Sequence, residues 1–290
     1  MPSSTTKILS STDGTTIFAE ATGDPGNLHL VLLSGLALSG CVFDDMCADQ
    51  RLLELLYIVR RLVFGMIFAA TGVVGSPILW RRTRRNYLQD DFRTVMDAFG
   101  LNKPVLAGWS IGATVATDVV THLPPDTISG IIYLAGVPGT SVAPEMVAPA
   151  LFELFPAFST DDSVTAYQAA TAVVTDRLFA HPKAVPYAVK AWYLGQRLTP
   201  AIMGFSLSRA MDIDSLWKAG TGRSSFARRR GTKDGHRGGS AKNVDEVMRP
   251  HFKNYESVWL EGRGHALHYE SPNEIVDLLI TFTKKVAGKK

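Results

Sequence analysis

The pentapeptide Gly108-Trp109-Ser110-Ile111-Gly112 places a serine between two glycines. It follows a short apolar run and precedes an amphipathic one, so the sequence predicts a strand, a sharp turn and a helix. Such a turn exposes the serine hydroxyl at the carboxyl end of a parallel sheet, where open α/β sheets bind ligands. The helix that follows directs its positive end toward the same place. This setting is typical of a nucleophilic serine.

A serine hydroxyl is a weak nucleophile until a neighbouring base removes its proton. Proteins with this kind of turn supply the partners in the chain order serine, acid, histidine. His265 comes directly after a predicted strand and before the final helix, which is the place expected of the base. His268 has no such placement, and we interpret it as a core or surface residue.

The acid is predicted to lie in a loop between Ser110 and His265. Asp234, in the stretch Gly-Thr-Lys-Asp-Gly, meets this condition, and we predict that it orients the histidine. An Asp-Gly pair is often only a turn. Asp212 and Asp214 are the rival candidates, although their position indicates the end of an inserted segment.

Alternating strands and helices must position these residues. The pattern predicts an α/β fold with a mostly parallel, twisted sheet flanked by helices. Two strands are expected around the Asp13-Gly14 turn. Further strands are predicted within 28–35, 55–60, 104–110, 128–139 and 255–262, and helices within 90–100, 111–123 and 271–288. In the last helix, Ser271 is expected to cap the first turn.

A second kind of segment interrupts this alternation. Residues 140–215 are apolar, helical in pattern and punctuated by prolines. We interpret them as a helical insertion lying over one end of the sheet. Residues 1–139 and 216–290 then form the core.

Composition excludes several classes of protein. The 290 residues carry a net charge of +3, and the basic runs 81–85 and 227–230 have no interleaved aromatic residues, so no nucleic-acid partner is expected. Cys41 and Cys47 make neither a disulfide framework nor a zinc motif. The first residues show no apolar signal region, and a cytoplasmic location is expected.

Several motifs together carry a family resemblance: Ser34-Gly35-Leu36 after a strand, the Ser110 pentapeptide, Gly-Thr-Lys-Asp-Gly, and Gly-Arg-Gly-His ending at His265. With these the chain resembles the α/β-hydrolase family, in its serine-esterase and cofactor-free peroxidase-like branch, from about residue 15 to 286. The resemblance implies a helical cap between the sixth and seventh strands. A serine at the turn argues against the epoxide-hydrolase and dehalogenase branches, which use an aspartate there.

The resemblance also implies an oxyanion hole formed by the backbone N–H groups of Leu36 and Ile111. Ser34 stands where the family often has histidine, and backbone donors tolerate that exchange. No cofactor and no metal are implied. Trp109, Phe152 and Phe205 are expected to line an apolar substrate pocket, although packing within the cap is the alternative for such residues.

Two segments depart from the family pattern. Residues 62–80 form an uncharged apolar run where an Arg-Gly-rich loop is expected. The family loop YDLRGHGRSGKP has a possible coding string that, read one base later, gives Met66–Pro77 as it stands. We therefore hypothesise that 61–89 is translated out of frame. A similar doubt covers 220–239, which lacks the apolar run expected for the seventh strand.

The leading interpretation is a serine hydrolase that cleaves ester or related acyl bonds of a small or medium apolar substrate. A catalytically impaired or non-catalytic binding protein on the same scaffold is the alternative. Lyase or perhydrolase chemistry uses the same residues. A membrane anchor at 62–80 is the third possibility, disfavoured because the run lies between a strand and a helix of one sheet. The oligomeric state is left open.

Overall fold

The computed structural model describes residues 4–12, 14, 16–36, 38–60, 87–147, 149–160, 162–196, 209, 211–220, 224–231 and 241–288, and of residues 87, 220, 224–231 and 241–244 it describes the backbone. The described strands form one sheet in the order β1-β2-β4-β3-β5-β6-β7-β8. Their bounds are β1 Ser4–Ser10, β2 Thr16–Thr22, β3 Leu28–Leu33, β4 Leu56–Arg60, β5 Val105–Trp109, β6 Gly130–Leu134, β7 Ser224–Gly231 and β8 Asn254–Glu261.

The sheet is parallel from β4 to β8, while β1 and β2 add an antiparallel edge. The central strands are aligned residue by residue: Leu30 is paired with Val105, and Val105 with Gly130. The predicted fold class is therefore confirmed. The central strands are continuous apolar runs because helices cover both faces of the sheet.

Alternate residues of each central strand face opposite layers. In β6, Ile131 and Tyr133 pack into one core, whereas Ile132 and Leu134 pack into the other. The first core is covered by α3 Tyr87–Phe99, α4 Val115–His122, α11 Ile213–Gly220 and α12 Ala241–Met248. The second is covered by η1 Gly40–Phe43, α1 Asp44–Cys47, α2 Gln50–Leu55, α13 Leu267–Glu270 and α14 Pro272–Val286.

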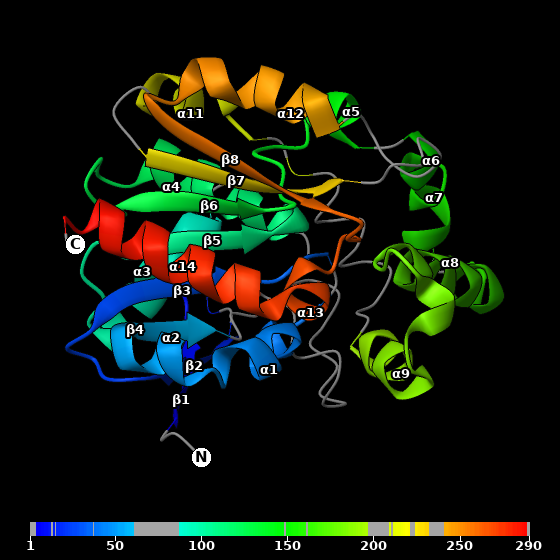
Figure 1. Cartoon of the computed structure of the whole chain (residues 1–290), viewed down its shortest axis with the longest axis horizontal. Helices are drawn as coiled ribbons and strands as arrows, with labels where there is room; N and C mark the ends of the chain where they lie inside the picture. Colours follow the sequence, from blue (N-terminus) through cyan, green and yellow to red (C-terminus); the bar gives the residue numbers. More distant parts are fainter. Residues whose placement is uncertain are drawn as a thin grey trace.

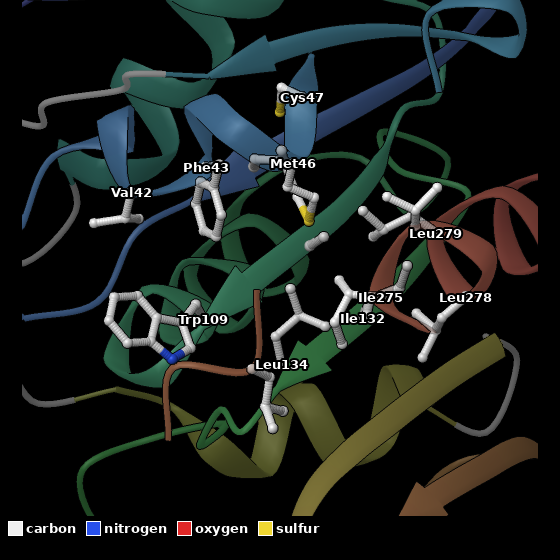
Figure 2. Close-up of a cluster of buried hydrophobic side chains, with 14 of the residues drawn as sticks. Val42, Phe43, Met46, Cys47, Trp109, Ile132, Leu134, Ile275, Leu278 and Leu279 are labelled. Atoms are coloured by element: carbon white, nitrogen blue, oxygen red, sulfur yellow. The ribbon is translucent and has the colours of Figure 1, made fainter. Parts of the chain in front are cut away.

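Figure 2 shows the second core, in which Phe43 and Met46 from the start of the chain meet Ile275 and Leu279 of α14 above Ile132. All five side chains are buried. Burying side chains of this size stabilises the fold by about 1.5–3 kcal/mol each before the entropy cost. The C-terminal helix is thereby fixed against the strand next to β5.

Between β6 and β7 the described chain is helical. The bounds are α5 Ala143–Met146, α6 Pro149–Phe152, α7 Phe155–Phe158, α8 Val164–Arg177, η4 Pro182–Ala184 and α9 Tyr187–Gly195. Helices α6 to α9 lie beyond the end of the sheet toward which β5 and β6 point (Figure 1). Met146 of α5 instead packs in the first core, against the sheet.

Three local expectations are corrected. Residues 224–231 form β7 despite their polar sequence, because β6 and β8 supply backbone partners on both sides. Two segments depart from the family pattern, and the rest of their residues, 61–86 and most of 220–239, lie outside the described part of the chain. The apolar run 62–80 is among them. Ser271 precedes α14 without capping it, and its hydroxyl is buried with no hydrogen-bond partner among the described residues. Between Ser110 and α4 a short 3-10 helix, η3 Ser110–Thr114, intervenes.

Within the part of the chain that the structure describes, no helix is long and apolar enough to cross a bilayer.

A largely buried ion pair joins Arg209 to α4. Arg209 pairs with Asp118 of α4, and its carbonyl accepts a hydrogen bond from the Thr140 hydroxyl at 2.7 Å. Burial raises the pKa of Asp118, although the positive charge of Arg209 opposes this effect. Burial also lowers the pKa of Arg209. Each charge therefore depends on the other to remain in a site that disfavours both.

We expect Arg209→Met to lower the free energy of unfolding by about 3 kcal/mol near neutral pH, because the Asp118 carboxylate is left buried and unpaired. The charge and hydrogen bond of Arg209 oppose the rise in the pKa of Asp118, so the pKa should rise further in the variant, which then gains a proton before the unaltered protein as the pH falls. The difference in the free energy of unfolding between the variant and the unaltered protein should therefore shrink as the pH falls from about 7 to about 4.5. Urea unfolding of both proteins measures it, with Asp118→Asn/Arg209→Met as control. A deficit that does not change with pH would contradict this account.

Candidate active site

Strand β5 turns directly into η3 at Ser110. Ser110 has a φ of +56°, in the left-handed region that residues other than glycine rarely adopt. A strained backbone at a single residue costs on the order of 1–3 kcal/mol and persists only where its surroundings hold it. The side chain of Ser110 is partly exposed, whereas Trp109 before it is buried. The turn thus presents the hydroxyl at the carboxyl end of the sheet.

The two glycines around Ser110 are required by close backbone approach. A Cβ on Gly108 would lie 2.2 Å from the Cα of Ala113, and one on Gly112 would lie 2.2 Å from the carbonyl oxygen of Ser34. The turn therefore folds back on its own helix and also packs against the segment after β3. Any larger residue at either position would force these backbones apart.

The segment after β3 lies against the serine. A Cβ on Gly35 would be 3.1 Å from the Cβ of Ser110. The segment is held in a turn in which Ser34 Oγ donates to the carbonyl of Leu38 at 2.6 Å. Leu36 is therefore placed next to the serine turn, and Ile111 follows Ser110 in the chain. Their roles as oxyanion donors stay a prediction.

His265 lies between β8 and α13, and the structure brings it to the same place. The indole Nε1 of Trp109 donates to the backbone oxygen of His265 at 2.8 Å. The two rings lie 5.5 Å apart between centroids. Because Trp109 immediately precedes Ser110, this contact fixes the loop of the histidine to the strand that carries the serine.

His268 is a core residue, one of the two places expected for it. Its Nε2 lies 2.9 Å from the hydroxyl of Tyr193 in α9, and its ring packs edge-on to Trp109 and Phe43. Burial, with a smaller effect from the nearby His265, lowers the pKa of His268 to about 3. His268 is therefore neutral over most of the pH range and joins a cap helix to the core.

Asp234 and Phe205 lie outside the described residues, so the structure does not place the predicted acid or this part of the predicted pocket. The rivals of Asp234 are both exposed. Asp212 accepts hydrogen bonds from the hydroxyl and the backbone N–H of Ser215, at 2.5 and 3.0 Å. These bonds lower the pKa of Asp212 and make it the cap of α11.

The remaining predicted pocket residues lie in two different surroundings. Phe152 packs edge-on against Phe155, with centroids 5.1 Å apart, and Phe155 belongs to the cap cluster that also contacts Leu36. Trp109 is only 1% exposed and lies beneath the serine turn. Their contact with a substrate stays a prediction.

Sequence reasoning missed two residues that join this site to the cap, Tyr193 and Glu270. The Glu270 carboxylate accepts backbone hydrogen bonds from Ala180 and from Gly264, next to His265. Only the short separation between Glu270 and His265 could have pointed to it. Among the described residues, no cluster of histidine, cysteine and acidic side chains has the arrangement of a metal site.

Gly112→Ala should lower the free energy of unfolding by about 2 kcal/mol or more, because the new methyl group would overlap the Ser34 carbonyl. Gly195→Ala is the matched control, since a Cβ there would meet no atom within 4 Å. Chemical denaturation of the two variants measures the difference. Equal stabilities would show that the close approach at Gly112 is not a constraint.

The lowered pKa of His268 predicts a loss of stability in acid. The unfolded chain takes up a proton near pH 6.5 that the folded chain refuses until about pH 3, so unfolding is favoured as the pH falls. As the pH falls from about 7 to about 5, this difference in proton binding lowers the free energy of unfolding by about 2 kcal/mol. His268→Leu should unfold with a correspondingly weaker pH dependence over this range. The same slope in both proteins would refute the assignment.

Three solved structures have a fold similar to that of this chain. An esterase from Rhodococcus sp. ECU1013 is 20% identical, with a TM-score of 0.78 over 97% of this chain and 99% of that one. An esterase from Exiguobacterium antarcticum is 17% identical, with a TM-score of 0.73 over 97% of this chain and 100% of that one. A bromoperoxidase from Bacillus anthracis is 15% identical, with a TM-score of 0.73 over the same shares.

At these identities the solved structures establish the fold alone. The search of curated proteins gave no match. The model of the alpha/beta hydrolase family matches residues 30–278, which include the serine turn, the cap helices and His265. The chain therefore belongs to the alpha/beta hydrolase family.

Proposed function

We propose that this protein is a serine hydrolase that cleaves ester or related acyl bonds of a small or medium apolar substrate. The observation that carries the proposal is the left-handed turn at Ser110, tied through Trp109 to the loop of His265. A structural serine has no need of a strained backbone, whereas a nucleophile gains exposure from it. The esterases of similar fold support the same chemistry.

The reaction follows from the position of each group. The Ser110 hydroxyl attacks the acyl carbon while His265 takes its proton, and the same histidine then protonates the leaving alcohol. Water repeats these steps to release the acid. Asp234 is proposed to hold the imidazole in orientation.

The segment after β3 supplies the electrostatic part of the proposal. A Cβ on Gly35 would lie 3.1 Å from that of Ser110, so this backbone runs beside the carbonyl under attack. We assign the N–H groups of Leu36 and Ile111 to the oxyanion that forms there. Backbone donors fixed in this way would need no reorganisation during the reaction.

The apolar side chains of the cap favour a substrate with an apolar acyl or alcohol group. Leu36 packs against the buried cluster of Phe158 and Ala170, in α7 and α8, as do Phe155 and Tyr167. The residue that we assign to the oxyanion hole therefore lies against apolar side chains of the cap. We propose that 140–215 acts as the cap domain over the core and sets the size of substrate accepted.

Hydrolysis of p-nitrophenyl butyrate by the purified protein tests the proposal. Ser110→Ala and His265→Gln should each lower kcat/KM about 10³-fold or more without loss of folding, because they remove the nucleophile and the base. A fluorophosphonate should label the unaltered protein at Ser110. Folded protein that neither hydrolyses the ester nor takes the label would favour the binding-protein alternative.

The acid can be assigned by the same assay. Asp234→Asn should lower kcat strongly, whereas Asp212→Asn should stay within about twofold, because Asp212 is already bound to Ser215. The reverse result would move the acid to Asp212.

A further inference from the structure

The carboxylate of Glu270, at the end of α13, joins two distant parts of the chain. One oxygen, Oε1, accepts the backbone N–H of Ala180 at 2.8 Å, and the other, Oε2, accepts that of Gly264. Ala180 follows helix α8 of the cap, and Gly264 directly precedes His265. A single side chain therefore spans the junction between the cap and the loop of the proposed base.

The backbones on the two sides of this junction are in contact. The N–H of Ala266 donates to the carbonyl of Leu178 at 2.8 Å. A Cβ on Gly264 would lie 2.5 Å from the nitrogen of Ala180 and 2.6 Å from the oxygen of Leu178. The backbone that follows α8 thus contacts the backbone of the histidine loop directly, so displacement of one is expected to displace the other.

Glu270 completes a set of bonds around His265. The Glu270 carboxylate accepts the N–H of Gly264, the residue before His265, and the Leu178 carbonyl accepts the N–H of Ala266, the residue after it. The carbonyl of His265 itself accepts the indole N–H of Trp109. Leu178 directly follows α8, and its side chain is buried in the same core cluster as Trp109. Hydrogen bonds to a charged group are roughly twice as strong as neutral ones, which makes the carboxylate the strongest member of this set.

We propose that Glu270 is a positioning residue that couples the end of α8 to the loop of His265. The docked cap then holds the histidine in place, and loss of the carboxylate releases both segments. The effect on catalysis rests on the proposed function of His265, whereas the link between the two segments does not. Glu270 itself takes no part in proton transfer.

Amide hydrogen exchange tests the link without any assay of activity. In Glu270→Ala the amides of Ala180 and Gly264 should exchange at least about tenfold faster than in the unaltered protein, because both lose their acceptor. Glu270→Gln, which is nearly isosteric and retains one acceptor oxygen, should give a smaller increase. Glu261→Gln is the matched control, since it removes an exposed carboxylate from the other end of the same loop. Unchanged exchange in Glu270→Ala would overturn the proposal.

Kinetics separate positioning from a merely structural role. At a temperature where it remains folded, Glu270→Gln should lower kcat for p-nitrophenyl butyrate about tenfold with a smaller change in KM, and should slow fluorophosphonate labelling of Ser110 equally. Glu261→Gln should stay within about twofold. Faster exchange with unchanged kinetics would refute positioning. If the unaltered protein shows no Ser110-dependent hydrolysis, the proposed function fails, and exchange still decides whether Glu270 joins the two segments.

Discussion

The backbone conformation of Ser110 is the constraint on which the rest of the structure depends. A left-handed residue between a strand and a helix is unfavourable for any side chain other than glycine, so its neighbours must compensate. Gly108 and Gly112 do so by allowing contact distances that no other residue permits. The parallel pairing of β5 with β3 and β6 holds the strand end rigid. The sheet therefore holds Ser110 in its unfavourable backbone conformation.

Trp109 extends this support across the site. Its ring belongs to the core formed with α14, and its indole nitrogen fixes the loop that carries His265. One residue thus anchors the proposed nucleophile through the chain and the proposed base through a hydrogen bond. The arrangement of side chains around it, His268 and Tyr193 included, makes the cap part of the same buried cluster.

Much of this was predictable from sequence because it depends on local pattern. Continuous apolar strands, the glycines around Ser110 and the histidine after the last strand each carry their signal within a few residues. β7 was not predictable, because its pairing with β6 and β8 comes from the neighbouring strands rather than from its own side chains. The contacts of Glu270 and Tyr193 were also beyond prediction, since each joins segments that are 75 or more positions apart. Asp234 stays a prediction.

The hydrogen bond between Thr140 and Arg209 has a consequence for the history of the fold. These residues lie 69 positions apart, yet the intervening segment leaves and re-enters the core at points within one hydrogen bond of each other. A segment with adjacent ends can lengthen, shorten or be exchanged with little cost in loop-closure entropy and no change in the strand order. Natural variation can therefore change the length of this segment without changing the strand order, provided that the contacts of Leu178 and Ala180 with the loop of His265 are kept. Because we propose that this segment sets the size of substrate accepted, recombination as well as point substitution is a route to new substrate preferences.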